Sequence, residues 1–91
     1  MIFDADPSAA TITDNAAFVF STDDLKVLAR ISVSATDYVT LNSKAVATVK
    51  GIGAVLKAAS GTSLYCAVVT TGTPTYAATS DVQVIFGILQ D

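Results

Sequence analysis

The chain has 91 residues, which is the size of a single domain and leaves no room for a separate catalytic lobe. Apolar residues make up 52% of it and charged residues 14%, against roughly 25% charged in typical soluble domains, and this composition excludes intrinsic disorder. Five basic and eight acidic residues give a net charge of -3, and the basic side chains are spaced singly, so no basic stripe for nucleic acid is present.

The N-terminal third is predicted to hold loops, a short strand and one helical turn. Residues 4–10 have loop composition with a turn at Pro7, and residues 11–13 have the alternation of a short strand. Ser21 or Thr22 is positioned to cap a single helical turn that runs to Leu28, with acidic residues in its first turn. All the acidic residues are Asp, which favours turns over helix interiors, so we expect at most one or two such turns.

From Val27 onward the sequence has the periodicity of β-strands. The predicted strands cover residues 27–34, 38–41, 45–50, 54–58, 63–71 and 82–89. The last two are apolar on both faces, which is typical of central strands that are covered on each side. Turn residues separate the strands at regular spacing. We therefore expect one mostly β domain over residues 1–91, a small β-sandwich or jelly-roll-like fold of antiparallel sheets.

Few side chains are candidates for chemistry. With no His and one Cys, neither a Cys/His zinc site nor a Ser-His-Asp or Cys-His pair can be built. Asp4 with Asp6, or Asp23 with Asp24, could serve acid–base work, but neighbouring Asp residues in turns are far more often caps. We expect no enzyme activity. Cys66 lies in an apolar run and is predicted to be an inert core thiol.

Two motifs begin like ligand-binding loops and then depart from the pattern. Residues 4–8 resemble the start of a calcium loop, but Ala9 stands where Gly is needed and Asn15 where a bidentate Glu belongs. Residues 51–53 start like a dinucleotide fingerprint, but Leu56 replaces its third Gly, so we interpret them as backbone geometry only. We expect no metal ion and no cofactor. No apolar run approaches the roughly 20 residues of a spanning helix, so no membrane contact is expected either.

The apolar composition of such a short chain predicts a partner. A domain of this size buries only about 60 to 65% of the surface of its unfolded chain, less than a larger domain does. Part of its apolar exterior is therefore expected to be covered by another subunit, either in a homo-oligomer or by pairing of strand edges. Tyr38, Tyr65 and Tyr76 offer an alternative, a stacking platform for a sugar or single-stranded nucleic acid, which requires the three rings to be exposed in one row. Without Trp or a basic groove, packing is the favoured role of these rings.

Five short stretches carry a resemblance to a known family: TDYV at 36–39, ATV at 47–49, ASGTSLY at 59–65, GTPTY at 72–76 and ILQD at 88–91. The chain resembles, from Phe3 to its C-terminus, a family of small tailed-bacteriophage virion proteins with capsid decoration or cement roles, encoded near the major capsid protein. Relatives carry an additional strand-rich segment before the position of Phe3, which implies that part of the family's sandwich is absent from this sequence.

The resemblance implies a structural protein of the capsid exterior that binds the major capsid protein and stabilises joints between capsomers. We expect the apolar side chains of residues 16–20 and 82–89 to form its interface: Phe18, Phe20, Val82, Val84, Phe86, Ile88 and Leu89. The alternatives are another structural subunit, from a tail, a fibre or a bacterial surface adhesin, and, less favoured, a small ligand-binding β module.

Overall fold

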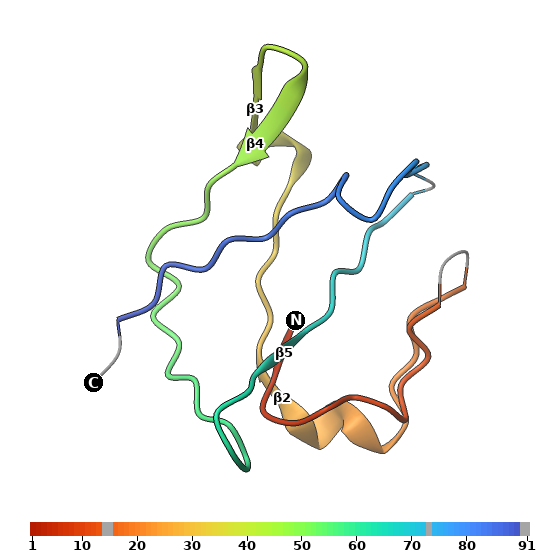
Figure 1. The fold of residues 1–91 in the computed structure, drawn as a ribbon, viewed down its shortest axis with the longest axis vertical. Coiled ribbons are helices and arrows are strands. Elements are labelled where there is room, and N and C mark those ends of the chain that lie inside the picture. The colour runs from red at the N-terminus through yellow and green to blue at the C-terminus, as the bar shows by residue number, and fades with distance from the viewer. Residues whose placement is uncertain (14–15, 73, 90–91) are drawn as a thin grey trace.

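The computed structural model describes residues 1–13, 16–72 and 74–89, and it is mostly β with short 3-10 turns (Figure 1). Over these ranges the elements are β1 (Ile2–Phe3), η1 (Thr22–Lys26), β2 (Val27–Ala29), η2 (Ala35–Asp37), β3 (Tyr38–Leu41), β4 (Lys44–Ala47) and β5 (Tyr65–Cys66). The prediction of antiparallel sheets with at most two short helical turns is confirmed at this level.

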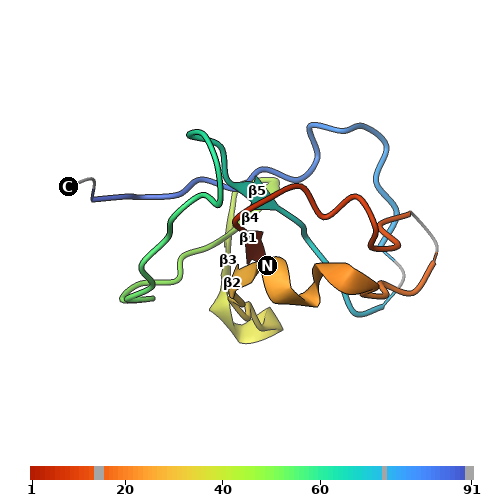
Figure 2. The same cartoon turned by 90° about the horizontal axis from the view of Figure 1, so that it is seen from below.

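One sheet has the order β2-β1-β5, and all its pairs are antiparallel. Phe3 of the central strand lies opposite Val27 on one side and Tyr65 on the other. The ladder extends one residue beyond β1. The Met1 ammonium donates to the carbonyl of Ala67 at 2.7 Å, and the Ala67 N–H donates to the carbonyl of Met1 at 2.9 Å. In Figure 2, η1 and η2 lie on one side of these strands and the C-terminal part of the chain lies on the other.

A separate two-stranded sheet is formed by the β3–β4 hairpin. Its register runs from Tyr38 opposite Ala47 to Leu41 opposite Lys44, with a two-residue turn between the strands. Asn42, the first turn residue, has a φ of 61°, a conformation that Asn tolerates better than most residues. The predicted strand at 38–41 and the turn after it are confirmed, whereas the strand predicted at 45–50 is paired only over Lys44–Ala47. Figure 1 shows the hairpin projecting away from the first sheet.

The core within the single chain is small. Its buried apolar residues are Ile2, Phe3 and Ala67, and the Phe3 side chain is completely enclosed. Phe20 packs edge-on against Phe3 with ring centroids 6.4 Å apart. The core therefore lies where the first strand passes between β2 and β5, and most of the apolar composition remains outside it.

Several predicted strands are shorter than expected or have no partner in the described residues. Residues 27–34 pair only over Val27–Ala29, residues 63–71 only over Tyr65–Cys66, and residues 54–58 and 82–89 join no sheet. Residues 11–13 contribute a single bridge from Thr11 to Val19. The physical reason is that periodicity reports side-chain alternation, whereas a strand also needs a neighbouring backbone, and the two-residue β1 offers only two pairing positions to each neighbour.

The molecule is open for its mass. Its accessible surface is 7669 Å², about 2,700 Å² more than the roughly 5,000 Å² typical of a folded 9.3 kDa monomer. The radius of gyration is 14.5 Å, against about 12 Å for a compact chain of this length. The two small sheets do not enclose a common core, and the expectation that both apolar strands would be covered is wrong for the single chain.

Candidate functional site: an exposed apolar surface

The first group of predicted interface residues surrounds the small core. The rings of Phe18 and Phe20 meet edge to face with centroids 4.8 Å apart, and Phe20 in turn contacts Phe3. Phe20 keeps 38% of its surface exposed and Phe18 is half-buried. The aromatic row therefore connects the interior with the surface, as a rigid anchor for a partner requires.

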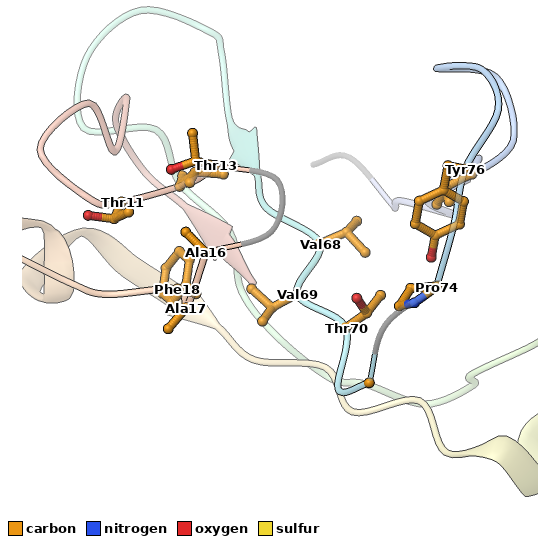
Figure 3. Close-up of a pocket in the computed structure, with 13 residues that line it drawn as sticks. Thr11, Thr13, Ala16, Ala17, Phe18, Val68, Val69, Thr70, Pro74 and Tyr76 are labelled. Atoms are coloured by element: carbon orange, nitrogen blue, oxygen red, sulfur yellow. The ribbon is translucent and has the colours of Figure 1, made fainter.

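An open cavity of about 560 Å³ lies next to this aromatic row (Figure 3). One wall comes from residues 11–13 and 16–18, and the other from the segment after β5, including Val68 and Val69. Val82 and Tyr76 also line it, so the fold brings Phe18 and Val82 to one site. None of the described lining residues is an Asp, Lys or Arg, and the cavity thus offers apolar surface and hydroxyl groups rather than charge.

A second, smaller cavity of about 110 Å³ lies between the C-terminal segment and the three-stranded sheet. Phe86 and Ile88 line it together with Ile2, Leu56 and Cys66, and Leu64 and Tyr65 complete its apolar wall. The predicted interface residues are thus divided between two places in the fold. Val84 is placed near neither cavity and is 51% exposed.

The face of the C-terminal segment that points away from the second cavity is exposed to solvent. Ile85 is 91% exposed and Leu89 is fully exposed, while the alternating residues Phe86 and Ile88 line the second cavity. Both faces of this segment are apolar, and within the chain only one face has neighbours. All the predicted interface side chains are therefore accessible to a partner to some degree, and Leu89 is the most accessible of them.

Cys66 differs from its prediction as a core thiol. The residue is exposed, and its thiol is free. The apolar run around it suggested burial, but β5 pairs only with β1, and the opposite edge of β5 has no strand beside it in the described residues. The exposure of Cys66 is thus consistent with an unpaired edge of the sheet at β5 in the described part of the chain.

The three tyrosines do not form a common platform. Each ring is roughly half exposed, but Tyr38 lies on the projecting hairpin, Tyr65 lines the second cavity and Tyr76 lines the first. A stacking site for consecutive bases or sugar rings needs the rings side by side. The arrangement gives no support to the ligand-binding alternative.

The Asp23–Asp24 pair is divided between interior and surface. Asp23 is fully buried, pairs with the ammonium of Lys26, and accepts a hydrogen bond from the N–H of Ala9 at 2.7 Å. The Lys26 side chain is the main cause of a lowered pKa at Asp23; burial opposes it, and the backbone N–H groups of Ala9 and Ala10 reinforce it. Asp24 is exposed. The two carboxylates share no site, and Asp23 ties the N-terminal loop to η1.

The helical turn itself is close to its prediction but is capped differently. η1 ends at Lys26 rather than Leu28, and β2 begins at once. Ser21 occupies the N-cap position, as expected, but its side chain makes no cap hydrogen bond. Lys26 instead donates to the backbone carbonyl of Asp6 at 2.7 Å, so long-range contacts hold this turn.

The remaining ligand motifs find no support. Asp4 and Asp6 lie in the N-terminal loop, Asn15 lies outside the described residues, and no cluster of three or more potential metal ligands occurs within the described part of the chain. Gly51 and Gly53 have φ values of 65° and 64°, a left-handed geometry that glycine adopts freely. They bend the backbone, in agreement with the interpretation made from the sequence.

Sequence reasoning missed the apolar surface of the β3–β4 hairpin as a candidate site. Val39, Leu41 and Val46 are exposed by 61%, 59% and 46%. The alternation that predicts these strands also places the side chains on one face, but alternation alone does not show whether that face is covered. The hairpin projects away from the first sheet and pairs with no other described strand, so these side chains stay exposed (Figure 1).

No helix in the described residues is long and apolar enough to cross a membrane. The chain was also compared with protein-family models, curated proteins and solved structures, and none of the three comparisons found a match.

Proposed function

We propose that this chain is a structural protein of a tailed bacteriophage that binds the outer surface of the capsid and stabilises the joints between capsomers. The supporting observation is the excess of exposed surface, about 2,700 Å² over that of a typical monomer of this mass. Stable protein interfaces bury about 1,200–2,000 Å² in total and permanent ones 2,000–5,000 Å² or more, so the excess is large enough for a permanent partner. The sequence resemblance supplies the identity of that partner, the major capsid protein.

The charge of the chain is compatible with the exterior of a capsid. The net charge is -3 and the five basic residues are scattered, which is unfavourable for contact with packaged DNA. Attachment would then depend on the burial of apolar surface, and the C-terminal segment would form the centre of the contact with the capsid. Ile85 and Leu89 would enter the capsid surface while Phe86 and Ile88 hold the segment to the three-stranded sheet.

The proposal includes a more complete fold in the assembled state. Residues 63–71 and 82–89 have the pattern of strands covered on both faces, yet only Tyr65–Cys66 is paired. Strands contributed by neighbouring subunits could extend the sheet from the open edges of β2 and β5, as in other cases of strand addition. A β-sandwich or jelly roll of the kind that the sequence predicts would then be formed on the capsid rather than in solution.

Binding to undecorated phage heads tests the proposal. The full chain is mixed with purified heads, and bound protein is measured after sedimentation. We expect saturable binding, and we expect Leu89→Asp to weaken it at least about tenfold, because a charge would enter an apolar interface. Leu25→Asp is the matched control, since Leu25 is 89% exposed on η1, away from the C-terminal segment, and should leave binding unchanged.

The absence of saturable binding by the unaltered chain would overturn the capsid role. Binding to purified tails or fibres but not to heads would replace it with the alternative of another virion subunit. An equal loss for Leu25→Asp and Leu89→Asp would refute the assignment of the C-terminal segment as the binding surface.

A further inference from the structure

The β3–β4 hairpin has one face that is strongly apolar. Residues directly opposite each other in an antiparallel pair point to the same side, so Val39 with Val46, and Leu41 with Lys44, form one face. The three aliphatic side chains are each between 46% and 61% exposed. We call this set, Val39, Leu41, Lys44 and Val46, the hairpin face.

An isolated hairpin of this kind is not expected to be stable in water. Two strands without a covered face are marginal, and stability requires a third strand or packing on an apolar surface. In the described residues β3 and β4 pair only with each other, and the sheet β2-β1-β5 lies elsewhere. Among the described residues the hairpin face therefore has no strand or sheet packed against it, and a second molecule can supply this cover.

Charge favours a second copy of the same chain as that cover. In a two-fold antiparallel arrangement, the turn end of one hairpin face lies against the base of the other. The turn end carries Lys44, and Asp37 lies at the base, immediately before β3. Both residues are exposed, and the ion pair found among the described residues, Lys26 with Asp23, involves neither. Two-fold packing would thus bring two Lys44–Asp37 pairs together at the rim of an apolar contact.

The exposed area is also what a permanent homo-oligomer requires. The hairpin face alone would be a small contact, but the chain as a whole exposes about 2,700 Å² more than a typical monomer of this mass. That excess is spread over the chain and is not confined to the hairpin face. An assembly that buries it would have an interface in the range of obligate oligomers, in which the single chain has little stability of its own.

We propose that the β3–β4 hairpin is a self-association element: it packs against the same hairpin of a second copy through the hairpin face, and this symmetric assembly, rather than the single chain, is the stable folded unit. The inference concerns the chain in solution. It requires no capsid, and it goes beyond the capsid role proposed above.

The test uses the full chain without phage heads. Sedimentation equilibrium should give an even-numbered oligomer, and the melting temperature should rise over a roughly hundredfold increase in protein concentration, as mass action requires when association stabilises the fold. Val39→Asp should raise the dissociation constant at least about tenfold. Val55→Asp is the control: Val55 is 91% exposed, lies outside the hairpin, and should leave the dissociation constant unchanged.

A charge series tests the geometry without touching apolar packing. Lys44→Glu places like charges opposite each other and should weaken self-association, and adding Asp37→Asn should recover part of the loss. Asn is chosen because the Asp37 carboxylate also accepts a hydrogen bond from the N–H of Ser34 at 2.7 Å, and the amide oxygen can keep that bond. Partial recovery would not occur if Lys44→Glu merely disturbed the hairpin.

A monomer whose melting temperature is independent of concentration would overturn the inference. So would equal effects of Val39→Asp and Val55→Asp, or the lack of recovery in the charge series. These results are distinguishable from failure of the proposed function, since a chain that assembles through the hairpin but ignores phage heads would disprove only the capsid role.

Discussion

Asp23 is the residue on which the N-terminal half depends most directly. It is a fully buried residue of η1. Its carboxylate pairs with Lys26 and accepts a hydrogen bond from the N–H of Ala9, which links η1 to the N-terminal loop. The sequence identified residues 23 and 24 as a pair of neighbouring carboxylates, in which a capping role was more probable than catalysis. It could not show which of the two is buried, because burial depends on Ala9, which comes from a loop much earlier in the chain.

Replacing Asp23 should lower stability and remove part of its dependence on pH. The pKa of Asp23 is below the ordinary 3.8, so the ionised form stabilises the fold above that pH, and this contribution is lost as the pH falls through the lower, folded-state pKa. Asp23→Asn should therefore melt earlier than the unaltered chain at pH ~7, with a smaller difference at pH ~3. Thermal unfolding, monitored by circular dichroism, measures the melting temperatures at both pH values.

Asp24→Asn is the control for the change in net charge, because Asp24 is adjacent and exposed. It should melt close to the unaltered chain at pH ~7. A difference for Asp23→Asn that stays constant down to pH ~3 would contradict an electrostatic role for its carboxylate.

Among the elements, local patterns predicted those that need only local contacts. The hairpin of β3 and β4 was anticipated because both strands and their turn lie within ten residues of sequence, 38–47. Residues 63–71 and 82–89 carry stronger strand patterns. In the first of these segments only Tyr65–Cys66 and the adjoining Ala67 pair with the N-terminal strand, and the described residues of the second join no sheet. Their pairing depends on distant backbone, or on another subunit, and no periodicity within the segment contains that information.

The hairpin turn gives a direct test of element stability. Asn42 has a positive φ at the first of two turn positions, a conformation that glycine adopts without strain. Asn42→Gly should keep or slightly raise stability, whereas Asn42→Val should destabilise the hairpin by about 1–2 kcal/mol, because a β-branched residue is strained in the left-handed region. Amide hydrogen exchange of β3 and β4 measures the change, and unaltered protection in Asn42→Val would be inconsistent with this turn.

For the whole molecule, composition indicates an exposed apolar surface, and the fold shows where that surface lies. A 52% apolar chain of 91 residues was expected to need a partner, and its buried apolar core consists of Ile2, Phe3 and Ala67. What the sequence could not provide is the location of the uncovered area, which is divided among the C-terminal segment, the hairpin face and the open edge of β5. Cys66 lies on that last strand and reports on its accessibility.

The Cys66 thiol should therefore distinguish the isolated chain from an assembly that covers β5. In dilute solution we expect rapid and complete labelling by a neutral maleimide, because the residue is exposed. Labelling should become at least about tenfold slower when phage heads are saturated with the protein, if strand addition at β5 occurs. Slow labelling in dilute solution would contradict the exposed position, and an unchanged rate on heads would locate the contact elsewhere.

The bond between the Met1 ammonium and Ala67, which spans 66 positions, also has a consequence for the order of events during synthesis. β1 is synthesised before both of its neighbours, and one of them, β5, lies far behind it in the sequence. Contacts of such long range are formed slowly. Until β5 pairs with β1, Phe3 lacks the contacts on that side that enclose it in the folded chain. Until β5 has been synthesised, the apolar residues of β1 are therefore unprotected and prone to aggregate with other chains.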